Sequence, residues 1–166
     1  MGKKHKILIV DDEKISLRMT DHILSSEYET VCAASGREAI DIFKAEQPNL
    51  VLSDLRMPEI DGFTLQTMLQ DELGRQVPFM FMTSDKKDET ESKSFSMGAL
   101  DYIRKPFRAD VLLRRVSNII TTVEQILLSA KELLGSDMTI PLGASIGCAF
   151  APDDGKDFLT LFKKAD

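Results

Sequence analysis

Cysteine is scarce in this sequence, and the two cysteines stand far apart. Cys32 and Cys148 are the only ones among 166 residues, and each lies in an apolar stretch. Small secreted domains that depend on disulfide bonds carry several cysteines at short spacings. We therefore expect two reduced core cysteines, a cytoplasmic location and no disulfide framework.

Long hydrophobic runs are also missing. Residues 1–10 begin with basic side chains, but Asp11 and Asp12 end the apolar stretch that follows. An export signal needs about 7–15 apolar residues, and a membrane-spanning helix needs about 20. The sequence therefore predicts no signal peptide and no membrane partner.

A basic excess is absent as well. The chain has 27 acidic residues against 21 lysines and arginines, which gives a formal net charge of -6. Proteins that bind nucleic acid through its phosphates present a basic face, often beside a helix-turn-helix. We find neither pattern and expect no nucleic-acid partner.

From residue 6 to about residue 116, short apolar runs alternate with amphipathic stretches. We predict strands at 6–10, 29–33, 49–53, 78–82 and 100–103, and helices near 14–26, 36–46, 62–73 and 86–97. Strands separated by helical patterns indicate β-α-β units and a parallel sheet. Continuously apolar strands are typical of a sheet that helices cover on both faces. The predicted fold class is therefore α/β and doubly wound.

Four predicted strands end in residues that suit phosphoryl chemistry. In chain order these are Asp11 and Asp12, then Asp54, then Thr83 and Ser84, and last Lys105 with Pro106. Ligands of open parallel sheets bind outside the carboxyl ends of the strands. We therefore expect carboxylates, hydroxyls and an ammonium group to meet in one crevice.

The three carboxylates divide into a nucleophile and metal ligands. Asp54 can accept a phosphoryl group as an acyl phosphate. Asp11 and Asp12, together with Asp54, suit Mg²⁺, which prefers oxygen ligands. The backbone carbonyl of Arg56 is a further candidate ligand. Because clustered carboxylates repel one another, the site should favour a bound cation.

The remaining residues suit the phosphate itself. Lys105 offers a compact positive charge to a phosphate oxygen, Thr83 can donate a hydrogen bond, and the small Ser84 leaves room. The bond before Pro106 is a candidate cis peptide, since only bonds to proline adopt cis at low cost.

Each feature taken alone has a simpler interpretation. An Asp-Asp pair after a strand often caps a helix, an Asp-Pro neighbourhood is usually a turn, and Lys-Pro is usually surface loop. It is the order of the whole set, at successive strand ends, that favours a single site.

Residues 4–116 resemble the receiver domain of bacterial two-component response regulators. The matching blocks are ILIVDDE, LVLSDLRMPEIDGF, PFMFMTS and MGALDYIRKPF, in this order. The resemblance implies a flavodoxin-like five-stranded sheet with strand order 2-1-3-4-5. It also implies a phosphorelay role, in which Asp54 accepts a phosphoryl group from a sensor histidine kinase or a phosphotransfer protein, with Mg²⁺ as cofactor.

The same resemblance assigns roles to other residues. It implies that Asp11 and Asp12 hold the metal, that Thr83 is the switch hydroxyl, and that Lys105 contacts the phosphate. It places Tyr102 at the switch aromatic position, which is expected to turn inward when Thr83 moves toward the phosphate.

Residues 108–134 contain no glycine or proline, and Gly135 is placed to end the helix. Apolar residues recur here at steps of four and three, at Leu112, Val116, Ile119, Val123, Ile126, Ala130 and Leu133. This heptad-like seam predicts an extended C-terminal helix. Two alternatives stay open: a dimeric stalk over 117–135, or one helix packed on its own chain.

Residues 139–166 resemble the closing segment of GGDEF diguanylate cyclase domains. The similarity lies in Ser145-Ile146-Gly147, in the Pro152–Gly155 turn and in the final Ala165-Asp166, which predict a small strand-helix appendage. No Gly-Gly-[Asp/Glu]-Glu-Phe motif occurs in the chain. We therefore interpret 136–166 as a cyclase remnant without cyclase activity, whose orphan strand pairs with a second copy or docks on its own chain.

Three functions remain in competition. The first is a phosphorylation-switched module, residues 1–116, which acts through protein contacts or homodimer formation and catalyses only its own phosphotransfer and dephosphorylation. The second is a pseudo-receiver that serves only as a scaffold, and the complete acidic set with Lys105 argues against it. The third, an active nucleotide cyclase, is disfavoured by the missing motif.

Overall fold

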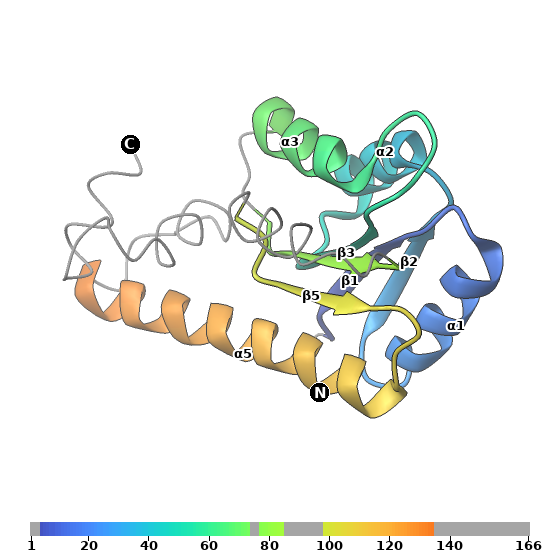
Figure 1. The fold of residues 1–166 in the computed structure, drawn as a ribbon. Helices are drawn as coiled ribbons and strands as arrows, with labels where there is room; N and C mark the ends of the chain where they lie inside the picture. The colour runs from blue at the N-terminus through green and yellow to red at the C-terminus, as the bar shows by residue number, and fades with distance from the viewer. Residues whose placement is uncertain (1–3, 74–76, 85–97, 135–166) are drawn as a thin grey trace.

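The computed structural model describes residues 4–73, 77–84 and 98–134. This part of the chain forms five strands and four helices (Figure 1). In chain order they are β1 (Lys6–Val10), α1 (Lys14–Leu24), β2 (Glu29–Ala33), α2 (Gly36–Glu46), β3 (Leu50–Asp54), α3 (Gly62–Leu73), β4 (Phe79–Thr83), β5 (Asp101–Arg104) and α5 (Ala109–Leu134).

The strands form one parallel sheet in the order β2-β1-β3-β4-β5. This order confirms the predicted doubly wound fold. The chain leaves β1 toward β2 on one side and later returns to β3 on the other. The carboxyl ends of β1 and β3 therefore flank the point where the direction of winding reverses, which is where ligands of such sheets bind.

Helices cover both faces of the sheet (Figure 1). The core beneath α1 and α5 includes Leu24, Leu112 and Val116, and the core beneath α2 and α3 includes Phe43 and Leu65. Every residue of the central strand β3 and of β4 is buried. Burial on both faces explains why these strands are continuously apolar instead of alternating.

Three strands lie one residue later than predicted. Predicted strands 49–53, 78–82 and 100–103 are observed as β3, β4 and β5. Pro78 has no N–H and therefore cannot donate within the sheet, although its carbonyl accepts the N–H of Val51 at 2.9 Å. Because β3 and β4 end one residue later than predicted, Asp54 and Thr83 are the last residues of these strands and not the first residues after them.

Helix α1 ends at Leu24, two residues before the predicted limit. The hydroxyls of Ser25 and Ser26 donate to the carbonyls of His22 and Ile23 at 3.3 and 2.8 Å. Such local side-chain bonds compete with helix continuation. Cys32, on β2, is half-buried and free, and burial is the main cause that raises its thiol pKa to about 11.

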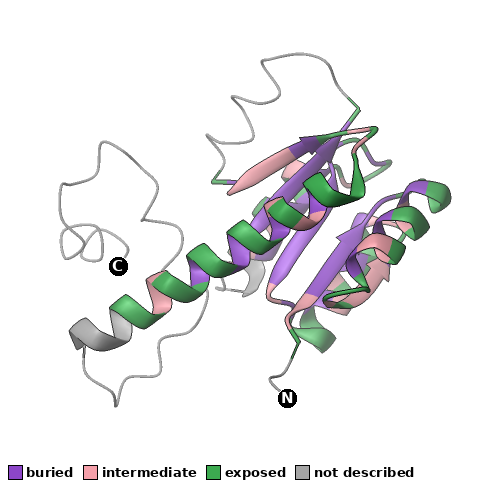
Figure 2. Ribbon diagram, turned by 90° about the horizontal axis from the view of Figure 1, so that it is seen from below, coloured by how far each residue is buried: buried purple, intermediate pink, exposed green. Residues whose placement is uncertain are grey.

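Helix α5 is continuous over 26 residues. The seam residues Leu112, Val116, Ile119 and Val123 are buried in the core under the sheet, and Figure 2 shows the exposed face of α5 pointing away from it. Over 112–123 the seam thus packs on its own chain. No helix in the described ranges is long and apolar enough to cross a lipid bilayer.

Two predicted parts lie outside the described residues. They are the helix near 86–97 and the cyclase-like segment 136–166, which includes Cys148. The side chains of the late seam positions Ala130 and Leu133 lie outside them too.

The two ends of α5 offer a matched test of its packing. Leu112 is 0% exposed and Leu128 is 61% exposed. We expect Leu112→Ala to lower the free energy of unfolding by about 2–5 kcal/mol, because it leaves a cavity in the core. Leu128→Ala should change it by no more than about 0.5 kcal/mol. Urea unfolding at low protein concentration measures both, and equal losses would contradict the observed packing.

Candidate phosphoryl and metal site

Three carboxylates converge at the carboxyl ends of β1 and β3. One oxygen each from Asp11, Asp12 and Asp54 lies within 4.8 Å of the others. Asp11 and Asp54 are buried, whereas Asp12 is exposed. An oxygen-only set that opens to solvent on one side suits Mg²⁺, which keeps several of its waters.

Asp54 is held from the side of α3 by a close approach of two backbones. The N–H of Gly62, the first residue of α3, donates to the carbonyl of Leu55 at 3.0 Å. A Cβ added at Gly62 would lie 2.5 Å from the backbone oxygen of Asp54. Only glycine therefore allows α3 to start so close to the end of β3.

Asp11 is bound on both of its oxygens. Oδ1 accepts the N–H of Glu13 at 2.9 Å, and Oδ2 accepts the hydroxyl of Ser16 at 2.5 Å. The first bond is a local aspartate turn. The N-cap of α1 is Glu13, and no side chain makes a capping hydrogen bond there, so the simpler interpretation of the Asp-Asp pair as a helix cap is not supported. Ser16 was not predicted as a site residue. The available signal was a hydroxyl on the buried face of α1, where apolar side chains are expected.

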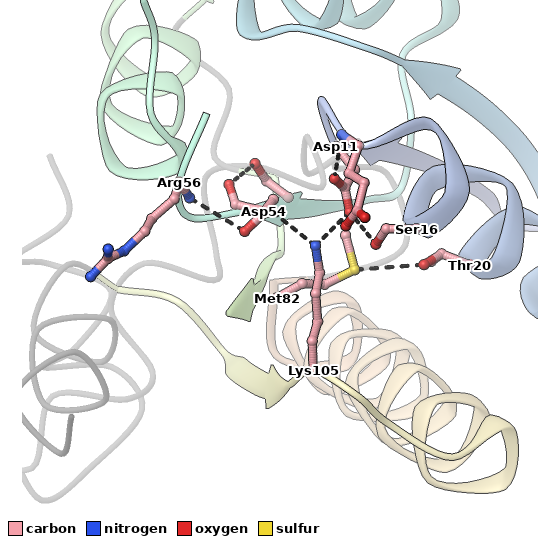
Figure 3. Close-up of polar contacts among 9 residues, drawn as sticks. Asp11, Ser16, Thr20, Asp54, Arg56, Met82 and Lys105 are labelled. Atoms are coloured by element: carbon pink, nitrogen blue, oxygen red, sulfur yellow. Dashed lines mark hydrogen bonds and ion pairs between the residues drawn. The ribbon is translucent and has the colours of Figure 1, made fainter. Parts of the chain in front are cut away.

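Lys105 joins the two buried carboxylates. Its Nζ lies 2.6 Å from Oδ2 of Asp11 and 2.8 Å from Oδ2 of Asp54 (Figure 3). The N–H of Lys105 donates to the carbonyl of Thr83 at 2.7 Å, and the peptide bond to Pro106 is cis. The lysine that follows β5 thus reaches back across the sheet to β1 and β3.

The charges at this site do not balance. Three carboxylates and one ammonium group leave a formal charge of -2. Burial lowers the pKa of Lys105, but its hydrogen bonds and its charge interactions with Asp11 and Asp54 outweigh burial, so this pKa is raised above 10.5. A group whose pKa is higher in the folded than in the unfolded state stabilises the fold. This stabilisation is fully present at pH values below the pKa of the unfolded chain, and it is lost as the pH rises through the pKa of the folded state. At neutral pH the ammonium group therefore stabilises the site in full.

The other predicted residues surround this cluster at different depths. Thr83 is buried at the end of β4, one position past Met82, the register partner of Asp54, and Ser84 is exposed just beyond it. The N–H of Arg56 donates to Oδ1 of Asp54 at 3.3 Å. Figure 3 shows the Arg56 side chain pointing away from Asp11 and Lys105, so the side chain is not part of the cluster.

Tyr102 lies on β5, opposite Phe81 in register. Its ring is half-buried against the core beneath α2 and α3. The guanidinium carbon of Arg104 lies 6.0 Å from the ring centre. Its inward movement on switching stays a prediction.

A family model described as "Response regulator receiver domain" matches residues 7–117. The chain belongs to this family. The match ends inside α5, which runs on to Leu134. The carboxylate cluster lies at the end of the receiver sheet where Asp11 follows β1 and Asp54 ends β3.

Curated relatives and solved structures agree with this assignment. The chain is 37% identical over 124 residues to the probable transcriptional regulator ycf27 of Porphyridium aerugineum, covering 74% of this chain and 51% of the relative. It is 40% identical over 110 residues to the regulatory protein AtoC of Escherichia coli, covering 65% of this chain and 23% of that protein. The chain thus spans about half the length, or less, of these relatives.

Two solved structures show the same fold. A response regulator receiver domain protein from Clostridium thermocellum has a TM-score of 0.64 at 25% identity, covering 79% of this chain and 99% of that one. The chemotaxis protein CheY4 of Vibrio cholerae has a TM-score of 0.64 at 27% identity, covering 70% and 98%. Both matches span nearly the whole of the solved chain.

Lys105 has a natural control at the opposite end of the sheet. Lys6 also joins two carboxylates, with Nζ 3.0 Å from Glu29 and 2.6 Å from Glu46, but both glutamates are largely exposed. We expect Lys105→Met to lower the free energy of unfolding in EDTA by about 3–5 kcal/mol, because it leaves buried carboxylates without their cation. Lys6→Met should lower the free energy of unfolding much less, since solvent screens the ion pairs of Lys6.

Magnesium should separate the two variants further. The unbalanced carboxylates of Lys105→Met should gain more stability from Mg²⁺ than the unmodified chain does, since binding to the folded state alone raises its stability. Lys6→Met should respond as the unmodified chain does. Urea unfolding of the unmodified chain and both variants, with Mg²⁺ and with EDTA, gives the six values needed, and an equal response of both variants would contradict the role of Lys105.

Proposed function

We propose that this receiver domain takes up a phosphoryl group on Asp54 from a sensor histidine kinase or a phosphotransfer protein in the cytoplasm, in a reaction that depends on Mg²⁺. The observation that supports the proposal most is the convergence of three carboxylates within 4.8 Å, two of which, Asp11 and Asp54, are joined by Lys105. In this proposal Asp11, Asp12, Asp54 and the backbone carbonyl of Arg56 hold the metal. Bound there, Mg²⁺ would offset charge on the transferring oxygens.

In the transfer, an Asp54 oxygen bonds to phosphorus as the bond from phosphorus to the donor nitrogen breaks. The electron pair of that bond stays on the donor imidazole, which leaves as histidine. Asp54 forms an acyl phosphate with about two negative charges. Lys105 is already within 2.8 Å of Oδ2 and can follow the new charge, and Thr83 and Ser84 donate to the phosphate oxygens.

In this proposal, phosphorylation changes the hydrogen-bond and charge partners of Lys105 and Thr83. Before transfer, Lys105 contacts Asp11, just after β1, and Asp54, at the end of β3, and its N–H is bonded to the Thr83 carbonyl. Contacts that Thr83 and Lys105 can make only with the phosphate favour a second arrangement of the segments that carry them. These contacts shift the equilibrium between the two arrangements. We propose that the side chain of Tyr102, on β5, turns inward when Thr83 moves toward the phosphate. The complete acidic set supports this function over that of a scaffold.

Asp54 offers a direct test. After incubation with acetyl phosphate and Mg²⁺, we expect the intact mass to rise by one phosphoryl group, because acetyl phosphate carries the same transferable group as a phosphohistidine. Asp54→Asn should show no gain, and EDTA should abolish the gain in the unmodified chain. Asp41→Asn, which alters an exposed aspartate of α2, is the matched control and should be labelled normally. Labelling of Asp54→Asn, or none of the unmodified chain even with a histidine kinase, would reject the proposal.

We further propose that residues 136–166 are a GGDEF-like remnant without cyclase activity, and that they link two copies in a homodimer. The apolar strand predicted within 139–150 has no partner in the sequence, and unpaired backbone groups favour pairing. Light scattering should give a dimer mass for the full chain and a monomer mass for residues 1–135. Monomers in both would remove the dimer proposal, and cyclic di-GMP made from GTP by the pure chain would overturn the inactive assignment.

A further inference from the structure

The buried face of α1 carries two hydroxyls where an amphipathic helix normally carries apolar groups. Its buried residues are Ser16, Thr20 and Leu24, spaced four apart. Thr20 directs its hydroxyl to the sulfur of Met82 at 3.8 Å, whereas Ser16 donates to Oδ2 of Asp11 at 2.5 Å (Figure 3). A helical serine commonly bonds a backbone carbonyl one turn back. Here it bonds a metal-site carboxylate instead.

Asp11 depends on these protein partners because it is 0% exposed. It accepts three hydrogen bonds, from Glu13, Ser16 and Lys105, of about four that a carboxylate can accept. One acceptor position is left for a metal-bound water or for the metal. The orientation of Asp11 is therefore fixed before any cation binds.

The three bonds differ in what they can hold once a divalent cation is present. The Glu13 N–H fixes only Oδ1 and leaves rotation of the carboxylate plane open. Lys105 is a mobile cation, and a second cation beside it weakens its hold on Oδ2 through charge repulsion. The Ser16 hydroxyl is neutral and 6% exposed as a residue, so it can keep Oδ2 in place in both states.

We propose that Ser16 is a positioning residue of the metal site. Its hydroxyl holds Oδ2 of Asp11 toward Asp54, so that the three carboxylates converge without a reorganisation cost when Mg²⁺ arrives. The proposal rests on the proposed function, since it concerns the same metal site. Partners that orient metal-binding carboxylates typically contribute about 10–100-fold to metal affinity.

The test is the affinity for Mg²⁺ alone, measured by titration calorimetry without any phosphate donor. Ser16→Ala should bind Mg²⁺ at least about tenfold more weakly than the unmodified chain. Ser16→Thr, which keeps the hydroxyl, should restore most of the affinity. Thr20→Val is the matched control: it removes a buried hydroxyl from the same face, one turn away, that bonds Met82 and not Asp11. Its Mg²⁺ affinity should be unchanged.

The outcomes separate this inference from the proposed function. Ser16→Ala with unchanged affinity, or equal weakening in Ser16→Ala and Thr20→Val, would overturn the role of Ser16 and leave the proposed function standing. An unmodified chain that binds no Mg²⁺ would overturn both. If Ser16→Ala does not fold, Ser16→Cys decides. A thiol is similar in size but a weak donor, so weaker Mg²⁺ binding supports the role and unchanged binding rejects it.

Discussion

Mutual repulsion of three carboxylates is the constraint on which this domain is built. Asp11 and Asp54 are buried, and burial of like charges is unfavourable unless a cation joins them. Lys105 supplies that cation across 2.6 and 2.8 Å, but the formal charge stays negative. The remaining negative charge favours the binding of a divalent cation beside these carboxylates.

The fold supplies the geometry that keeps these carboxylates close together. Strands β1 and β3 are neighbours in the sheet, and their ladder runs up to the pair Val10 and Ser53, the residues directly before Asp11 and Asp54. Gly62 brings α3 against the backbone of Asp54, and Ser16 brings α1 against Asp11. Helices α3 and α1 thus hold the two carboxylates from opposite faces of the sheet, and support by rigid elements is what a precise site requires.

The sequence predicted much of this and missed specific parts for physical reasons. The strand ends at Asp11, Asp54 and Lys105 were predictable because parallel strands align their carboxyl ends at one edge. The start of β4 shifted by one residue because Pro78 has no N–H to donate to the ladder, although its carbonyl accepts from Val51. Ser16 was missed because a hydroxyl on a helix face does not reveal its partner. Its bond to Asp11 depends on how α1 packs against the end of β1.

The position of Lys105 also ties the site to the long helix. Lys105 follows β5, and α5 starts at Ala109, with Phe107 between them packed against the core that contains Leu112. Three residues, Pro106 to Arg108, separate Lys105 from α5. A movement of the backbone at Lys105 would therefore act on the segment from which α5 starts. Helix α5 is continuous to Leu134, so it connects this segment with residues beyond position 117, where the family match ends.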